Sequence, residues 1–260
     1  MQRPHWLTRW WRHRTGADRR IPFATWHAAV DGLTCLRGLS AVERARLRVR
    51  VTWFLQHKTL NGVQGLELSP AMRIQIAAQA CLPILNLGTE YFDGWYEVIV
   101  YPGSFRVPRS FEDDAGVVSE SEQILSGEAW ERGPVILAWS DIEQDRYDTD
   151  TTSNVIIHEF AHKLDMLNGS ANGMPPLHAE MSRPTWTRAW TTAYAALRHR
   201  LARHETPTID PYGETDPAEF FAVASEYFFT APWSLLDEFP AVYEQLRQFY
   251  RQDPAARLAR

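Results

Sequence analysis

The stretch IIHEFAHKLD, residues 156–165, sets two histidines and a glutamate in an otherwise apolar segment. In a helix, residues four apart lie one turn apart on the same face, so His158 and His162 can offer two imidazole nitrogens to one cation. Polar groups that are buried without partners are costly, and a metal ion is one such partner. The alternative is an ordinary surface helix with two exposed histidines, which the apolar neighbours disfavour.

Glu159 directly follows His158 and is therefore rotated by about 100° around the helix. It is badly placed to be a ligand, but it can stand beside the metal and accept a proton from the attacking water. The pattern H-E-x-x-H thus indicates one zinc ion (Zn2+) per chain, with His158 and His162 as ligands and Glu159 as the general base of a hydrolase.

A catalytic zinc needs a third protein ligand and an open fourth position. Zinc proteases with the longer pattern H-E-x-x-H-x-x-G-x-x-H are excluded, because Asp165 and Asn168 occupy its last two defined positions. The histidine candidates, none with a spacing in its favour, are His178, His199 and His204. The other common solution is a glutamate on a later helix. The candidates in the segment YGETDPAEFFAVASEYF are Glu214, Glu219 and Glu226.

Three acidic residues keep two interpretations each. Asp216 is a good N-cap, Pro217 suits the first helical position, and Glu219 stands three residues after the cap. A capping box would therefore explain Glu219 without any metal. Asp165 either hydrogen-bonds a ligand or a neighbouring side chain, or is a plain acid at the end of a helix. Glu226 either supports the site or lies on the surface.

The composition is that of a globular protein. The 260 residues are 45% hydrophobic and 23% charged, and eleven tryptophans and twelve phenylalanines supply core material. The net charge of -5 is too mild to predict nucleic-acid binding. No apolar run reaches the length of a membrane span, and the N-terminus lacks the apolar region of a secretion signal. Cys35 and Cys81 are predicted to be buried free thiols, which is typical of a reducing cytosol. We therefore expect a cytoplasmic protein without membrane or nucleic-acid partners.

Residues 1–20 form a basic segment with six arginines and one acidic residue. Three tryptophans, Trp6, Trp10 and Trp11, interleave with the arginines. The segment is either an arm for a membrane surface or nucleic acid, or a stretch whose tryptophans pack on the domain while its arginines face water. Residues 21–260 are predicted to form a single domain with a helical first third and a catalytic core at about residues 95–255.

Helices are expected in most of the chain, and strands in two short segments. Helix signals predict helices over 41–58, 70–87, 151–167, 182–204, 217–230 and 241–251, although residues 45–51 also alternate like a strand. Strands are predicted over 95–101 and 134–139, and residues 106–133 are predicted to form an irregular loop or a loose hairpin. Strands come early and helices late, which indicates the α+β class: mostly helical, with a small sheet beside the zinc-binding helix. The strand PVILAW, residues 134–139, is either a sheet edge that binds a substrate backbone or an internal strand.

The combination of HEFAHKLD with DPYGETDPAEFFAVASEYFF resembles the Mlc titration factor A family of zinc metallopeptidases. The resemblance extends to YPGSF and GPVILAWSDI and is weakest in residues 1–20. It implies that Glu219, in the AEFF segment, is the third zinc ligand and that Tyr212 stabilises the transition-state oxyanion. It also implies a gluzincin-like core with a site similar to that of lethal-factor-type toxin proteases, an aminopeptidase-like activity, and binding to a transcriptional repressor of the Mlc type.

Together, the motif and the resemblance predict a zinc metallopeptidase that hydrolyses peptide substrates. The competing hypothesis is a regulatory binding protein that sequesters a transcriptional repressor and whose peptidase activity is latent. Nucleic-acid binding through residues 1–20 is a weaker third interpretation.

Overall fold

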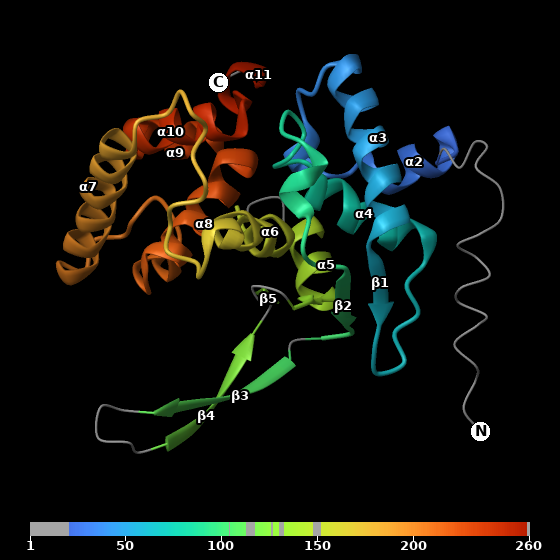
Figure 1. Ribbon diagram of the computed structural model, residues 1–260, viewed down its shortest axis with the longest axis horizontal. Helices are drawn as coiled ribbons and strands as arrows, with labels where there is room; N and C mark the ends of the chain where they lie inside the picture. Colours follow the sequence, from blue (N-terminus) through green and yellow to red (C-terminus); the bar gives the residue numbers. More distant parts are fainter. Residues whose placement is uncertain are drawn as a thin grey trace.

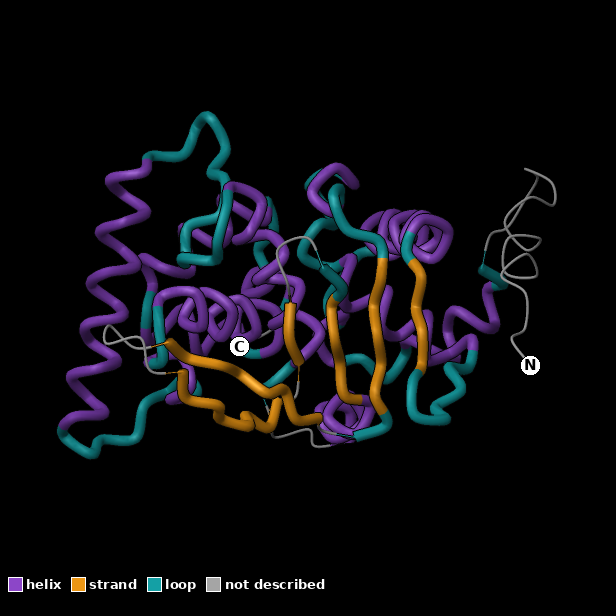
Figure 2. The backbone as a smooth tube through the Cα atoms, turned by 60° about the horizontal axis from the view of Figure 1, so that its bottom comes forward, coloured by secondary structure: helices purple, strands orange, loops and turns teal. Residues whose placement is uncertain are grey.

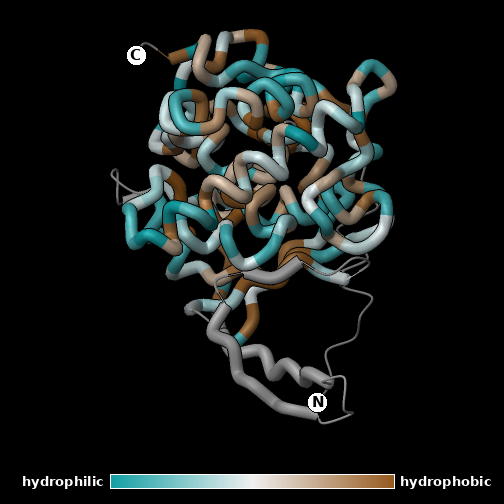
Figure 3. The backbone as a smooth tube through the Cα atoms, turned by 90° about the vertical axis from the view of Figure 1, so that its left-hand side faces the viewer, coloured by the Kyte–Doolittle hydropathy of each residue, from teal (hydrophilic) through white to brown (hydrophobic). Residues whose placement is uncertain are grey.

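The computed structural model describes residues 21–103, 105–112, 118–125, 127–129, 133–147 and 152–258. The basic segment at residues 1–20 lies outside this range. One cluster of buried apolar side chains extends through the described chain, from Ile21 to Ala255. Figure 3 shows hydrophobic stretches running through the interior of the helical body and hydrophilic stretches over much of its outside. No helix in the described part of the chain is long and apolar enough to cross a membrane.

The first part of the chain is helical, as predicted. It contains α2 (Phe23–Val30), η1 (Thr34–Leu36), α3 (Ala41–His57), α4 (Pro70–Cys81) and η2 (Thr89–Phe92). The capping box of Ser40 and Glu43 starts α3, and the Ser69 hydroxyl accepts the Met72 N–H at the start of α4. Helix α4 ends at Cys81, well before Gly88, because Pro83 has no N–H with which to continue the helical hydrogen bonds.

A four-stranded sheet follows the order β1-β2-β6-β5. Its strands are β1 (Thr59–Gly62), β2 (Glu97–Tyr101), β6 (Val135–Ala138) and β5 (Gly127–Ala129). The first three are parallel, and β5 pairs antiparallel with β6 at the edge. Figure 2 shows the strands side by side with helices packed behind them. The α+β prediction is confirmed, and so are both predicted strands.

Strand β6 is internal, because β2 and β5 flank it and all four of its residues are buried. The interpretation of residues 134–139 as a sheet edge is therefore wrong. The sheet edge next to the helix that carries the H-E-x-x-H motif is β5, which lies within the segment predicted to be a loop or hairpin. The same segment also contains a hairpin of β3 (Phe105–Glu112) and β4 (Val118–Leu125). Trp139 was predicted to end the strand at 134–139, but it instead begins α5 (Trp139–Tyr147).

The C-terminal part is helical. It contains α6 (Val155–Asp165), η3 (Met166–Asn168), α7 (Arg183–Ala202), η4 (Pro211–Glu214), α8 (Pro217–Thr230), α9 (Pro232–Glu238), α10 (Pro240–Tyr250) and α11 (Pro254–Arg257). In Figure 1, α6 lies in the middle of the molecule, between the sheet and α8. The predicted helices are confirmed, whereas α2, α5, α9 and α11 were not foreseen.

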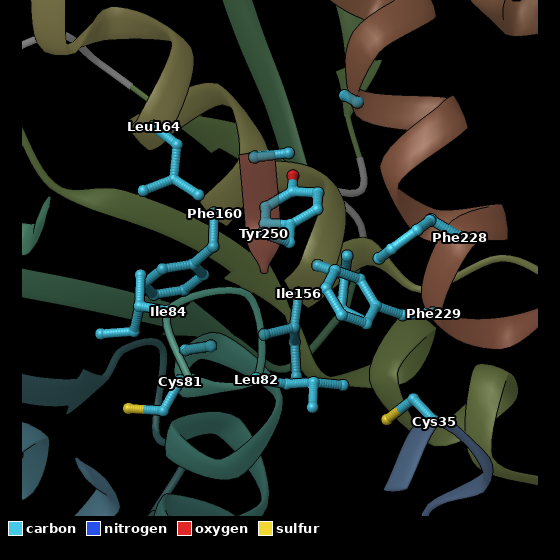
Figure 4. Close-up of a cluster of buried hydrophobic side chains, with 14 of the residues drawn as sticks. Cys35, Cys81, Leu82, Ile84, Ile156, Phe160, Leu164, Phe228, Phe229 and Tyr250 are labelled. Atoms are coloured by element: carbon cyan, nitrogen blue, oxygen red, sulfur yellow. The ribbon is translucent and has the colours of Figure 1, made fainter. Parts of the chain in front are cut away.

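Helix α6 is buried along one side. Ile156, Phe160 and Leu164 follow each other at intervals of four and lie in the core shown in Figure 4. The Phe160 ring contacts Phe92 and Trp95, with centroid separations of 5.3 and 5.6 Å. His158 is two residues after Ile156 and therefore about 200° away around the helix. The apolar side thus fixes the direction in which the histidines point.

Both cysteines are buried and free, as predicted. They appear among the core side chains in Figure 4. Burial raises the pKa of the Cys35 thiol to about 12, and burial also raises the pKa of Cys81. Neither thiol forms a thiolate readily.

Asn154 caps α6 and links it to α4. Its Oδ1 accepts the Ile157 N–H at 2.9 Å, and its Nδ2 donates to Gln79 Oε1 at 2.6 Å. We expect Asn154→Ala to lower the free energy of unfolding by about 2–4 kcal/mol, because it removes an N-cap and leaves a buried partner unsatisfied. Urea unfolding measures this. Ser40→Ala, which removes an exposed cap, is the control and should cost about 1 kcal/mol. Equal losses in the two variants would contradict the importance of the buried link.

Candidate metal centre

Helices α6 and α8 bring three predicted ligands together. His158 Nε2 and His162 Nε2 are 3.2 Å apart, and they lie 3.0 and 3.3 Å from Glu219 Oε2. Among the described residues, this is the one group of His, Cys, Asp and Glu side chains that could hold a metal ion. In a tetrahedral zinc site with bonds of about 2.0–2.1 Å, neighbouring ligand atoms are about 3.4 Å apart. The observed spacing is close to this value.

The chemistry of the donor set also fits a cation. His158 Nδ1 lies 2.7 Å from Glu226 Oε1, and the carboxylate requires a proton on Nδ1. Neutral His158 therefore has its lone pair on Nε2, which faces the Glu219 carboxylate and His162. Lone pairs that converge in this way repel each other unless a cation or an additional proton lies between them. The site therefore suits a divalent metal held by two imidazoles and one carboxylate.

The pKa shifts report the same convergence. Burial alone would lower the pKa of His158, but its hydrogen bonds with Glu219 and Glu226 raise it well above the usual value. Burial alone would raise the pKa of Glu219, yet the two histidines hold it far below its usual range. Glu219 is therefore ionised at any physiological pH and offers a charged oxygen to a cation.

Glu219 combines a structural and a site role. Asp216 Oδ1 accepts the N–H groups of Ala218 and Glu219, at 2.8 and 3.0 Å, so Asp216 is the N-cap of α8 as predicted. The Glu219 carboxylate contacts the two histidines instead of completing a capping box. The capping interaction thus explains the backbone of Glu219 but not the position of its side chain.

Glu226 holds His158 in place. It is buried, and besides its contact with His158 its Oε2 accepts the backbone N–H of Asn154 at 2.5 Å. Glu226 thus connects α8 to both the start of α6 and the first histidine. The interpretation of Glu226 as a surface residue is wrong.

Asp165 fastens the loop that follows the metal-motif helix. Its side chain is fully buried, and its Oδ2 accepts the N–H groups of Asn172 and Gly173 at 2.8 and 2.7 Å. Gly173 has a φ of 78°, and a Cβ there would lie 2.4 Å from the Pro217 carbonyl oxygen. The loop is therefore pressed against the start of α8, two residues before Glu219. Asp165 is more than a helix-end acid, because it joins the two helices that carry the candidate ligands.

Glu159 and Tyr212 lie near the three candidate ligands. Glu159 is buried on α6, beside His158, and its charge acts on that imidazole. Tyr212 belongs to η4, and its ring centroid is 6.1 Å from that of His158. Asp210 accepts the Tyr212 N–H, and the Tyr194 hydroxyl donates to the Glu214 carbonyl, so η4 is fastened at both ends. Tyr212 is nevertheless 41% exposed, which suits a group that meets a ligand from solvent.

The remaining ligand candidates lie elsewhere. His178 Nε2 donates to the Phe249 carbonyl at 2.7 Å. His199 and His204 are exposed, at the last turn of α7 and just beyond it. Glu214 Oε1 is 3.6 Å from Arg198 Nε. These residues are not part of the metal-binding group.

Two charged residues near the site, the buried Lys163 and the partly buried Asp145, were not foreseen. Lys163 Nζ donates to the Gly133 carbonyl at 2.9 Å, and burial lowers its pKa to about 8. Asp145, on α5, accepts the Val155 N–H at 3.0 Å, and burial raises its pKa to about 6, with a further contribution from the charge of Glu226. Lys163 could have been suspected, because it is a lysine in an apolar helix. Asp145 carried no such signal, because α5 was not predicted.

Comparison with known proteins agrees with this geometry. The sequence matches the family of glucose-regulated metallo-peptidases M90 over residues 7–251. It is 40% identical over 253 residues to Mlc titration factor A of Yersinia pestis (strain Pestoides F), covering 96% of this chain and 92% of the relative. The identity and coverage are the same for Mlc titration factor A of Yersinia pseudotuberculosis serotype O:1b (strain IP 31758). A family match over nearly the whole chain and a His-His-Glu group that could bind a metal lead to one conclusion: the chain belongs to the M90 family of metallopeptidases.

Proposed function

We propose that the protein is a zinc-dependent peptidase with a gluzincin-like core, in which His158, His162 and Glu219 hold the metal. The observation that carries this proposal is the convergence of three donor atoms from α6 and α8, with the carboxylate of Glu159 beside them on α6. Bound zinc would polarise the scissile carbonyl and lower the pKa of the attacking water.

The protein side chains divide the remaining work. Glu159 accepts the proton from the water and passes it to the leaving amine, as a general base and then a general acid. The Tyr212 hydroxyl donates a hydrogen bond to the oxygen on which negative charge develops. Glu226 keeps His158 in the orientation in which Nε2 faces the metal.

The sheet supports a peptide as substrate. In the described sheet, β5 is an edge strand that contacts α6. An extended peptide can pair with such an edge and run past the metal site. In this mode, called strand addition, main-chain hydrogen bonds hold the peptide in one chain direction. Aminopeptidase-like cleavage is part of the proposal on the strength of the family resemblance. We also propose a cytoplasmic location, and a catalytic core at about residues 95–255 within a single domain.

A second proposed function is regulatory binding. The relatives are named Mlc titration factor A, a name that points to the Mlc repressor. The protein would then sequester a transcriptional repressor of the Mlc type while its peptidase activity stays latent. The two functions are separable, because a repressor complex does not need Glu159.

Zinc titration of ligand variants tests the metal site. We expect about one zinc per chain in the wild type and a loss of affinity by orders of magnitude in His158→Ala and Glu219→Gln, since each removes a ligand atom. Glu226→Gln should weaken binding by about 10–100-fold, because it disturbs a ligand without being one. Glu214→Gln is the matched control and should bind like the wild type. Full zinc occupancy in His158→Ala would end the peptidase hypothesis.

The general base is tested by Glu159→Gln. This variant should keep its zinc but hydrolyse peptides at least about 100-fold more slowly, because glutamine cannot accept the proton. A peptide-library cleavage assay with metal analysis measures both quantities. Glu143→Gln, at an exposed position on α5, is the control. If the wild type cleaves no peptide yet binds a repressor, and Glu159→Gln binds it equally well, the regulatory function replaces the enzymatic one.

Tyr212→Phe tests the oxyanion role. We expect kcat to fall by about 100-fold with little change in KM or zinc content, because the hydroxyl is used only in the transition state. Tyr96→Phe changes a more exposed tyrosine, 73% accessible, and should leave kcat unchanged. An unaltered kcat in Tyr212→Phe would make Tyr212 a plain loop residue.

A further inference from the structure

Two lysines, one of them on α6, are buried near one indole ring. Lys58 and Lys163 are only 6% and 3% exposed. Lys58 Nζ lies 4.1 Å from the centre of the Trp95 ring, and Lys163 Nζ lies 5.4 Å from it. Lysine is almost never fully buried unless it is paired, and two like charges close together add repulsion. This pair of lysines therefore needs specific compensation.

The compensation differs between the two lysines. Lys58 donates to the carbonyl oxygens of Phe92 and Trp95, and its nearby carboxylate is Asp93. Lys163 donates to the Gly133 carbonyl, and its nearby carboxylate is Glu159. Only Lys163 therefore connects this buried charge to the metal site.

Lys163 lies between two parts of the proposed site. It is four residues after Glu159 on α6, so the two side chains share a helix face. Gly133 stands between β5 and β6 in the chain, two residues before β6 begins. One ammonium group thus acts on the carboxylate of the general base and donates to Gly133, just before the strand that pairs with the edge strand β5.

We propose that Lys163 is a positioning residue that holds Glu159 and Gly133, just before β6, in one fixed arrangement. This inference rests on the proposed peptidase function. The ammonium balances the buried carboxylate of Glu159, and its hydrogen bond to Gly133 sets the distance between α6 and the start of β6, the strand with which the edge strand β5 pairs. Proton acceptor and peptide-binding edge are then aligned before a substrate arrives, which is the condition for efficient catalysis.

Lysine suits this task for a chemical reason. Its ammonium is a compact charge with three donors, so it can serve a carbonyl and a carboxylate in different directions. Glutamine at position 163 keeps a donor for Gly133 but loses the charge. Methionine keeps much of the volume but loses both functions. The two substitutions therefore separate the two parts of the proposal.

The kinetic test compares zinc-loaded wild type with Lys163→Gln, Lys163→Met and Lys58→Met. We expect kcat to fall by about 10–100-fold in Lys163→Met and by less in Lys163→Gln, with zinc content retained and KM changed less than kcat in Lys163→Gln. Lys58→Met makes the same substitution at the other buried lysine beside Trp95. It should lower the midpoint of urea unfolding but keep kcat within about twofold. Equal losses of kcat in Lys163→Met and Lys58→Met would overturn the proposal, because both lysines would then be purely structural.

A double-mutant cycle on unfolding tests the charge pair without any activity measurement. Lys163→Met should lower the urea midpoint clearly in the wild type but much less in the Glu159→Gln background, where no buried carboxylate loses its counter-charge. Equal shifts in both backgrounds would disprove the coupling. If the wild type hydrolyses no peptide, the proposed function fails, while the cycle still decides whether Lys163 and Glu159 act as a pair.

Discussion

The packing of α6 against α8 is the constraint on which the rest of the site depends. Helix α6 buries Ile156, Phe160 and Leu164 in the core, which turns His158 and His162 toward α8. Helix α8 is itself largely buried, and it presents Glu219 near its start and Glu226 two turns later to the same histidine. Because the apolar contacts fix both helices, the donor atoms converge without any flexible loop between them. A site held in this way is organised before a metal binds.

Buried charges extend this arrangement in three directions. Glu226 joins His158 to the N-terminus of α6. Asp165 joins the C-terminal end of α6 to the loop that packs on the start of α8, and Lys163 joins α6 to Gly133, just before β6. Each of these groups would be costly to bury alone, and each makes at least one hydrogen bond to a backbone group outside its own helix. The polar network thus specifies how the helices, the loop and the sheet fit together, while the apolar core supplies most of the stability.

The same architecture supports both proposed functions. In the proposed hydrolysis Glu159 and Tyr212 act beside the metal, whereas the proposed sequestering of a repressor requires only a stable surface. Tyr212 is partly exposed and stands on a short 3-10 helix held by Asp210 and Tyr194, so it can meet either a peptide or a protein. Glu159 is a buried carboxylate with the buried Lys163 nearby, and a surface that only binds a protein does not need such a pair. This contrast favours an enzyme.

Local patterns in the sequence determined the longer helices and singled out His158 and His162 as a candidate pair. The spacing of His158 and His162, the cap at Asp216 and the apolar period of α6 are all properties of neighbouring residues, and the structure bears them out. Glu219 was singled out only with the help of a family resemblance, because its position after Asp216 also satisfies a capping box. Strand β1 and the edge position of β5 escaped prediction, because three or four residues carry too little periodicity to identify a strand. The roles of Glu226, Asp165 and Lys163 were decided by tertiary structure alone. The backbone partner of Glu226 lies 72 residues away in the sequence, and that of Lys163 lies 30 residues away. The partners of Asp165 lie in a loop without regular structure, seven and eight residues further on. No local pattern encodes which backbone group will bond to a buried charge.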